Sequence, residues 1–241
     1  MRSAERDFLL FLLAASAGSA DGWSYLGLGH AFVANMTGNT VLTGIAVFQK
    51  GGDVFHPLLS LCCYATGAAL ASFFTRKVRQ GVVWAKAITF TLLLEAILMA
   101  CAAAGWVAVQ RHFGSNAVSQ PYLTLLLGCV ALAIGLQSGA MLQLKIPGIV
   151  TTYITGTWTI LVSGLVQLAT QEKRESPKQK ERFEERLLMQ AGVLVIYFLS
   201  AVLTGWLFRH MPLAVGALSA TSVLAVAIYA AARTRNADIN G

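Results

Sequence analysis

Residues 30–43 read HAFVANMTGNTVLT, and they decide how the chain is interpreted because a polar Met-Thr-Gly-Asn-Thr motif lies inside apolar sequence. A degraded copy, GIVTTYITGTWTIL, occupies residues 148–161, and each copy contains a Thr-Gly pair at the same position. A second pair of similar blocks begins at Tyr64 and at Tyr197. Interrupted apolar segments that recur at matching places are typical of transporter-like membrane proteins with internal repeats.

The composition excludes an ordinary soluble domain. Hydrophobic residues make up 56% of the chain and charged residues 12%, with a mean hydropathy of +0.64, whereas about a quarter of the residues in a soluble domain are charged. Several uncharged runs are long enough to cross about 30 Å of hydrocarbon as helices, and they lack the short alternating segments of a membrane β-barrel. The sequence therefore predicts an all-α polytopic membrane protein that is embedded in the lipid bilayer.

Eight helical segments are predicted, and the placement of Lys and Arg indicates how many of them cross the membrane. If all eight cross, the basic cluster Arg76, Lys77, Arg79 and Lys86 falls outside the cell. If the second and sixth segments re-enter or break instead, only Lys50, Arg111 and Arg209 of the 18 Lys and Arg residues fall outside. The predicted segments are approximately 8–28, 31–48, 57–76, 86–108, 121–144, 149–169, 188–208 and 213–233.

The favoured fold is therefore two inverted repeats, each with three transmembrane helices and one re-entrant or broken helix. The repeats are residues 1–110 and 115–235, and both chain termini are expected in the cytoplasm. An odd number of crossings in each repeat turns the second copy upside down relative to the first. Eight full spans is the alternative.

A charged insert, QEKRESPKQKERFEERLL at residues 171–188, interrupts the second repeat. It is expected in the cytoplasm, with a short helix that starts after Ser176-Pro177 and runs into the next span. A solvated linker is the favoured interpretation, and a partner-binding helix is the alternative. Residues 8–28 resemble a secretory signal, but a counterpart near residues 127–138 indicates a retained first span.

The two Thr-Gly motifs could carry chemistry. Polar groups inside a bilayer are unfavourable unless they are paired, glycine permits a broken helix, and hydroxyl and amide groups can coordinate a solute. Helix packing through small residues is an equally weighted interpretation, although the amide of Asn39 favours a function. The candidate pathway residues in the motifs are Asn35, Thr37, Gly38, Asn39 and Thr40 in the first copy and Thr155, Gly156 and Thr157 in the second.

Two acidic residues lie in apolar segments. Asp21 follows Gly18-Ser19-Ala20 in the first segment, and the second repeat has Gln137 near the matching position instead of an acid. An intramembrane carboxyl is a candidate proton carrier, cation ligand or partner of a buried base; the alternative is a capping residue at the membrane edge. Glu95, midway along the fourth segment, is expected to be protonated or hydrogen-bonded to the Thr-rich motif.

No catalytic set is recognisable. The sequence lacks a nucleotide-binding glycine loop, a zinc signature and a nucleophile elbow. The four cysteines, Cys62, Cys63, Cys101 and Cys129, are interpreted as small core hydrophobes. Basic residues lie between the apolar segments, so the net charge of +7 indicates topology and not nucleic acid. We therefore expect no enzyme activity, no cofactor and no metal.

The stretches Gly18-Ser-Ala-Asp21 and Met36-Thr-Gly-Asn39 resemble the YoaK-like family, domain of unknown function 1275, over nearly the whole chain. The resemblance implies a bacterial multi-pass inner-membrane protein without a settled biochemical role. The second motif copy is weak, with Tyr153 and Thr157 where the first has Asn35 and Asn39.

A secondary transporter or permease for a small solute is the predicted function. Asp21, Asn39 and Glu95 would handle an ion or proton, and the Thr-Gly motifs would line the solute site. The alternative is a non-transporting scaffold or sensor that docks a partner through residues 171–188. The sequence leaves the solute and homo-oligomer formation open.

Overall fold

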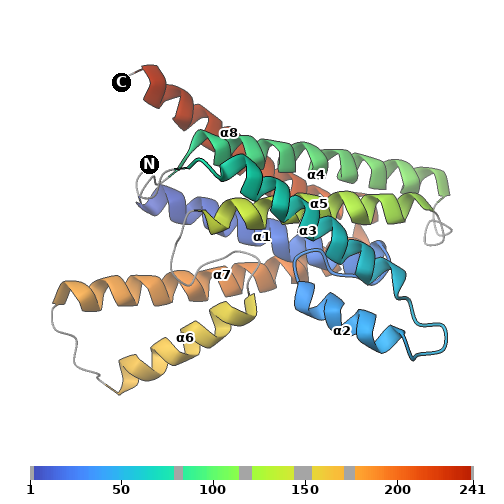
Figure 1. The fold of residues 1–241 in the computed structure, drawn as a ribbon, viewed down its shortest axis with the longest axis horizontal. Helices are drawn as coiled ribbons and strands as arrows, with labels where there is room; N and C mark the ends of the chain where they lie inside the picture. The colour runs from blue at the N-terminus through green and yellow to red at the C-terminus, as the bar shows by residue number, and fades with distance from the viewer. Residues whose placement is uncertain (1–2, 79–83, 114–120, 144–153, 171–176, 240–241) are drawn as a thin grey trace.

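The computed structural model describes residues 3–78, 84–113, 121–143, 154–170 and 177–239. Every regular element within these ranges is a helix, as predicted (Figure 1). In chain order the elements are α1 (Ser3–Gly27), α2 (Met36–Ala46), α3 (Phe55–Thr75), α4 (Lys86–Phe113), α5 (Pro121–Leu142), α6 (Ile154–Ala169), α7 (Pro177–His210), a 3-10 turn η2 (Pro212–Ala214) and α8 (Ala217–Ile239).

Five helices within the described ranges are long and apolar enough to cross a bilayer, namely α3, α4, α5, α7 and α8. The 25-residue α1 has the length to cross, but Asp21 and several serines lower its hydropathy. Its polar side chains are turned inward: Ser19 shares a 2.6 Å hydrogen bond with Ser219 of α8. Inward-facing polar residues are the usual arrangement in a membrane bundle.

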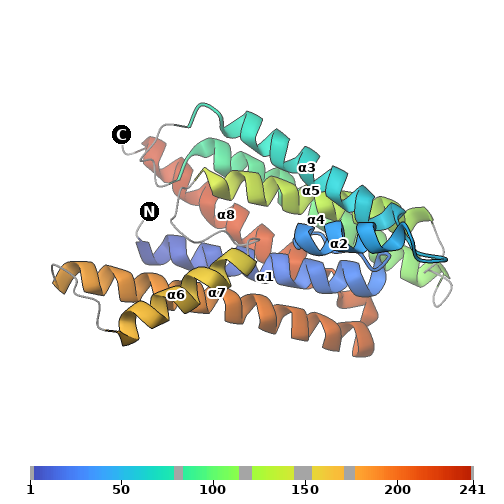
Figure 2. The same cartoon turned by 60° about the horizontal axis from the view of Figure 1, so that its bottom comes forward.

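The other two helices, α2 and α6, are short. At about 1.5 Å per residue, the 11 residues of α2 rise only about 16 Å and the 16 residues of α6 about 24 Å, against about 30 Å of hydrocarbon. In Figures 1 and 2 both helices begin near the middle of the molecule and run toward opposite ends. The lengths favour broken or re-entrant elements over full spans.

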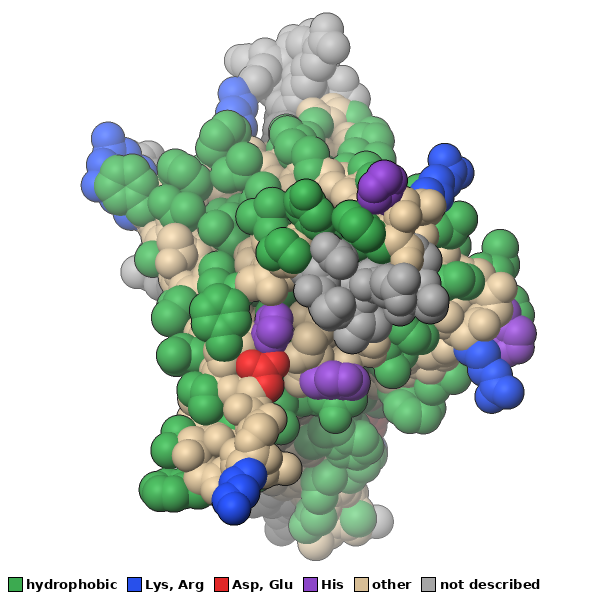
Figure 3. Space-filling view, turned by 90° about the vertical axis from the view of Figure 1, so that its right-hand side faces the viewer, with side chains coloured by type: hydrophobic (Ala, Val, Ile, Leu, Met, Phe, Trp, Pro, Cys, Tyr) green, Lys and Arg blue, Asp and Glu red, His purple; other side chains and the backbone are tan. Residues whose placement is uncertain are grey.

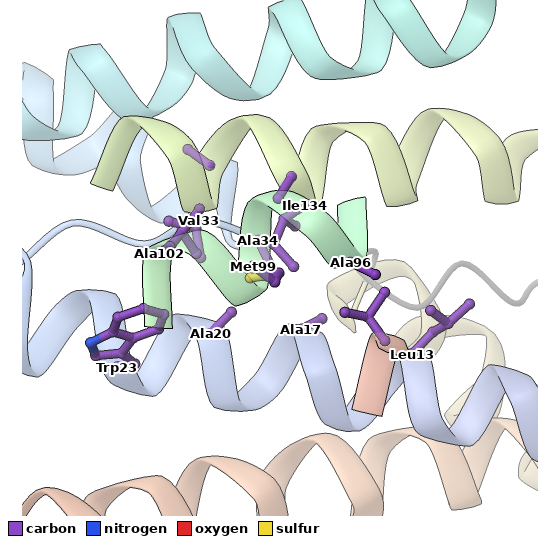
Figure 4. Close-up of a cluster of buried hydrophobic side chains, with 14 of the residues drawn as sticks. Leu13, Ala17, Ala20, Trp23, Val33, Ala34, Ala96, Met99, Ala102 and Ile134 are labelled. Carbon is purple, nitrogen blue, oxygen red and sulfur yellow. The ribbon is translucent and has the colours of Figure 1, made fainter. Parts of the chain in front are cut away.

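The long helices pack in interlocked pairs. Helix α3 packs along α5, α1 packs along α7, and α4 contacts both α5 and α8, while α8 also contacts α1. Small residues fill the centre, where Ala17 and Ala20 of α1 lie near Met99 and Ala102 of α4 (Figure 4). Small side chains allow membrane helices to approach closely.

Glycines mark the closest crossings of the paired helices. A Cβ atom added at Gly18 would overlap the backbone carbonyl of Tyr197 on α7, and one added at Gly135 would overlap that of Tyr64 on α3. The requirement for glycine at these two positions is therefore steric, since the partner backbone occupies the space of a side chain.

The outer surface is apolar, as a bilayer requires. Large hydrophobic side chains are exposed on several helices, among them Phe73, Ile97 and Phe198. Figure 3 shows one end of the molecule, where hydrophobic side chains lie on every side among uncharged polar side chains and backbone, and charged side chains are few. An apolar surface of this extent on separate helices indicates contact with lipid.

Two expectations about the elements need correction, and a third is confirmed. Residues 31–35 of the predicted segment 31–48 are not helical, because α2 begins only at Met36. The helix predicted to start after Ser176-Pro177 and to run into the next span is confirmed, because α7 begins at Pro177 and continues to His210. The cysteines are free, but Cys62 and Cys101 are exposed and not in the core.

Candidate functional site

The Met-Thr-Gly-Asn motif begins α2. The Asn35 side chain caps the helix by accepting a 3.1 Å hydrogen bond from the Gly38 N–H, the usual role of Asn at this position. The buried amide of Asn39 holds the preceding segment: its Oδ1 accepts from the Phe32 N–H at 2.9 Å, and its Nδ2 donates to the Phe32 carbonyl at 2.7 Å. The motif therefore fixes how the chain enters α2.

Asp21 joins three parts of the molecule. It lies on α1 and is 5% exposed. Its Oδ1 accepts backbone hydrogen bonds from Val33 at 2.8 Å, Ala34 at 2.6 Å and Asn35 at 3.4 Å. Its Oδ2 accepts a hydrogen bond from the hydroxyl of Tyr197 on α7. Asp21 thus satisfies donors at the beginning of α2, where the helix dipole also favours a negative charge, and ties that segment to α7.

A cavity of about 650 Å³ opens beside Asp21. It lies where α2 and α6 begin, and α3, α5 and α7 complete its wall. The lining combines hydroxyl and amide groups with apolar side chains, and no charged side chain is among the described residues that line it. Those residues are Ala34, Asn35, Met36, Thr37, Tyr64, Ser138, Leu142, Ile154, Thr155 and Tyr197.

The cavity brings together some of the residues that the sequence singled out. Asn35 and Thr37 from the first motif line it together with Thr155 from the second, so the beginnings of both short helices face one space. Asp21 lies behind this wall and reaches the cavity through its contacts with Asn35 and Tyr197.

The remaining candidates do not line the cavity. Gly38 and Asn39 support the α2 cap, and the Thr40 hydroxyl donates to Met36 of its own helix. Gln137 donates from Nε2 to the Leu13 carbonyl at 3.1 Å and so joins α5 to α1. Thr157 is buried on α6, next to the partly buried Gly156.

Glu95 stands apart from this site. Its side chain is completely buried on α4, and neither carboxyl oxygen has a hydrogen-bond partner within the described residues. The expected hydrogen bond between Glu95 and the Thr-rich motif is therefore not formed with any residue that the structure describes. A fully buried carboxyl without a partner is far more stable in the neutral form.

Sequence reasoning missed the three other lining residues that carry a hydroxyl group: Tyr64, Ser138 and Tyr197. A signal was present for the tyrosines, because each begins one of the two similar blocks. An aromatic hydroxyl at the same place in both copies is a candidate wall for a shared site. Ser138 is buried on α5, and its small side chain gave no signal in the sequence.

Asp53 and His56 form a polar cluster before and at the start of α3. Asp53 accepts from the backbone N–H groups of Phe55 at 3.0 Å and His56 at 3.1 Å, and its carboxylate also contacts the His56 ring. Slight burial acts to raise the pKa of Asp53, but the hydrogen bonds and charge of His56 outweigh it and hold the pKa below its usual value. The His56 ring reaches Thr124 of α5 at 3.1 Å, so this cluster anchors a loop outside the cavity.

Comparison with known proteins agrees with these observations. The family model described as "Protein of unknown function (DUF1275)" matches residues 9–231. The chain is 31% identical over 205 residues to the UPF0700 transmembrane protein YoaK of Bacillus subtilis (strain 168), and the alignment covers 83% of each chain. No solved structure matches. The resemblance found in the sequence is confirmed: the chain is a multi-pass membrane protein that belongs to the DUF1275 family.

Proposed function

We propose that the protein is a secondary transporter or permease for a small solute, built from two inverted repeats around the cavity. The observation that carries this proposal is the lining itself. Residues that match one another in the two halves, Thr37 with Thr155 and Tyr64 with Tyr197, face the same space. In transporters with inverted repeats, the solute site lies at the repeat interface and is formed by discontinuous helices.

The pattern of helix packing supports the two repeats. Let α1, α2, α3 and α4 correspond to α5, α6, α7 and α8 in turn. The contact of α1 with α7 then corresponds to that of α5 with α3, and the contact of α2 with α3 to that of α6 with α7. The contact of α4 with α5 likewise corresponds to the contact of α8 with α1. A duplicated chain with a pseudo-two-fold axis accounts for every one of these pairings.

The close crossings support the same correspondence and refine its register. Gly18 approaches the Tyr197 carbonyl and Gly135 approaches the Tyr64 carbonyl, which pairs Gly18 with Gly135. The spacing between the two motif copies, residues 30–43 and 148–161, would pair Ala17 with Gly135 instead. In this register Asp21 corresponds to Ser138, and both lie at the cavity or directly behind its wall. The two halves therefore differ at this position, where the first has the carboxyl group of Asp21 and the second has the hydroxyl group of Ser138.

The topology that fits this function has six spans, with both termini in the cytoplasm of a bacterial cell and the protein in the inner membrane. The short α2 and α6 then enter the membrane from opposite faces. No step of this function requires a cofactor, a metal or covalent catalysis. The described residues that line the cavity belong to one chain, and the proposal leaves homo-oligomer formation open.

A solute screen with a blocked cavity tests the proposal. Purified protein is screened by thermal shift against small metabolites, and solutes that stabilise it are tested for uptake into proteoliposomes. A ligand present at about 100 times its Kd should stabilise the folded protein by about 2.7 kcal/mol. Thr155→Trp, which fills the cavity, should abolish the shift and the uptake. Thr159→Trp is the matched control, because Thr159 is exposed one turn further along α6 and bonds only within that helix.

Two results would oppose transport. Solutes that stabilise the wild type and Thr155→Trp equally bind outside the cavity. A scaffold or sensor would be favoured by two results together. The protein would take up none of the solutes that stabilise it, and a partner protein would co-purify with it only when residues 171–188 are intact.

A further inference from the structure

We propose that Asp21 is a proton-binding site and that Tyr197 transmits its protonation state to the cavity. This inference deepens the proposed function, on which it rests for the solute, by naming a proton as the coupling ion. It comes from the contacts of one carboxyl group and from the position of one tyrosine between that group and the cavity.

The groups around Asp21 are hydrogen-bond donors. Three backbone N–H groups, of residues 33–35, point at Oδ1 at 2.6 to 3.4 Å. The Tyr197 hydroxyl points at Oδ2. With the Tyr197 hydroxyl as donor, these contacts suit the ionised carboxylate, which accepts hydrogen bonds but cannot donate one. A buried acid in this arrangement has one oxygen fully engaged by rigid backbone and the other by a single side chain that can turn.

This arrangement fits a proton better than a metal cation. Hard cations are bound by several oxygen atoms that present lone pairs, such as carbonyls and carboxylates. At Asp21 the neighbouring backbone presents N–H groups instead, and their positive ends would repel a cation at Oδ1. A proton needs only one lone pair, and Oδ2 offers it.

Protonation has a direct consequence for the cavity. A hydronium ion that reaches the cavity would transfer one proton to Oδ2 and leave as water, and the neutral carboxyl would then donate to the Tyr197 oxygen. The Tyr197 hydrogen, released from Asp21, would turn into the cavity that Tyr197 lines. No other bond is made or broken, and the cavity gains one hydrogen-bond donor for a solute. Binding of the proton and of the solute would thereby be coupled through a single hydroxyl.

Other titratable groups do not account for this coupling. The described contacts of the Asp21 carboxyl are the Tyr197 hydroxyl and the backbone of 33–35. Of the helices packed on α1, α5 has no charged side chain in its described length, and α7 has its charged residues toward its two ends. Arg233 of α8 is paired with Glu5 near the beginning of α1. His30 packs against Tyr25, and Glu95 does not line the cavity.

Thiol labelling across a pH series tests the switch without a known solute. The full chain, with its four cysteines replaced by alanine and Thr37→Cys introduced in the cavity wall, is reconstituted in nanodiscs and treated with N-ethylmaleimide. The labelling rate at each pH is divided by that of a Thr40→Cys control, which corrects for thiol ionisation. Thr40 lies on the same helix but outside the cavity lining. The corrected rate at Thr37→Cys should change at least threefold through one titration. The added change Asp21→Asn should make it independent of pH.

Infrared difference spectroscopy separates the proton site from the transmitting residue. Acidification should produce the C=O band of a protonated carboxyl in the wild type and in Glu95→Gln, but not in Asp21→Asn. Tyr197→Phe should keep the band and lose the pH dependence of labelling. If Asp21→Asn does not fold, the contrast between Tyr197→Phe and Glu95→Gln still decides the question.

Three outcomes would overturn the proposal: a labelling rate that does not depend on pH in the parent protein, pH dependence that survives in Tyr197→Phe, or pH dependence that is lost in Glu95→Gln. These outcomes leave transport itself intact, because a carrier without proton coupling would still bind solutes and fail only this test. Conversely, a protein that passes this test but takes up no solute would have the switch without the proposed transport.

Discussion

Asn39 shows how a residue that resembles a solute ligand can serve the fold instead. Both ends of its side-chain amide are bonded to Phe32, and the Phe32 carbonyl also accepts from Ser60 of α3 at 2.5 Å. A non-helical turn must run between α1 and α2 within the bundle, and its backbone groups need partners. An amide can supply both a donor and an acceptor, which explains an Asn at a buried position of a short helix.

Asn39→Ala should destabilise the protein by about 1–3 kcal/mol, because it leaves the buried Phe32 N–H without its partner. Thermal unfolding in detergent measures this. Thr40→Ala is the control and should change stability by no more than about 0.5 kcal/mol, since the exposed Thr40 bonds only within its helix. An Asn39→Ala protein of wild-type stability that fails to bind solute would show instead that the amide is a solute ligand.

At the scale of residues, sequence reasoning located the region of the site but not its wall. Asn35, Thr37 and Thr155 were identifiable because polar residues stand out in apolar sequence. Tyr64 and Tyr197 had only a weaker signal, their matching places in the two similar blocks, and the fold decides that both line one cavity. The partners of Asp21 were also unpredictable, because they are backbone groups and a hydroxyl far along the chain.

At the scale of elements, the apolar runs predicted every helix, and charge placement separated the two short elements from the long ones. The ends were less predictable. The turn before α2 is as apolar as a helix, but Gly29 and His30 adopt positive φ angles of 107° and 54°. Conformations of this kind interrupt a helix. The beginning of α7 at Pro177, in contrast, was predictable from Ser176-Pro177 and from the Lys, Glu and Arg residues that follow, because these residues favour a helix.

Gly18→Ala and Gly135→Ala should each destabilise the protein by about 1–3 kcal/mol, because the added methyl group overlaps the partner backbone and forces the helices apart. The two losses should be similar if the crossings are equivalent. Gly205→Ala is the matched control, since no atom lies within 4 Å of its added Cβ; alanine there should be neutral or stabilising by up to about 1 kcal/mol. Chemical or thermal unfolding measures all three. Equal effects at all three positions would contradict a steric role for the first two.

At the scale of the whole molecule, the two halves of the sequence are interlocked. Each of the tightest pairs, α1 with α7 and α3 with α5, joins one half to the other. Neither half can therefore form its core alone, and the units that would move against each other in the proposed transport cannot simply be residues 1–110 and 115–235. Packing instead groups α2 to α5 as one bundle and α1 with α6 to α8 as the other, with α4 against α8 between them.

The membrane topology gives the last prediction. A re-entrant α2 has both of its flanks on one face of the membrane, whereas a spanning α2 has them on opposite faces. His30 and Lys50 are exposed positions before and after α2, so single cysteines there, in a cysteine-free chain, distinguish the two arrangements. A membrane-impermeant maleimide applied to intact cells should label both from outside, because 11 residues are too few to cross.

A cysteine at Lys178, near the beginning of α7, should be labelled only after the membrane is permeabilised, since the charged insert belongs with the cytoplasmic excess of Lys and Arg. It therefore tests the orientation, while the pair at His30 and Lys50 tests the number of spans. Labelling of only one cysteine of that pair from outside would show that α2 crosses the membrane. Labelling of Lys178→Cys on intact cells would reverse the orientation, and with it the face from which α2 enters. If all three results agree with the prediction, α2 enters from outside and the corresponding α6 from inside, which is the arrangement that inverted repeats require.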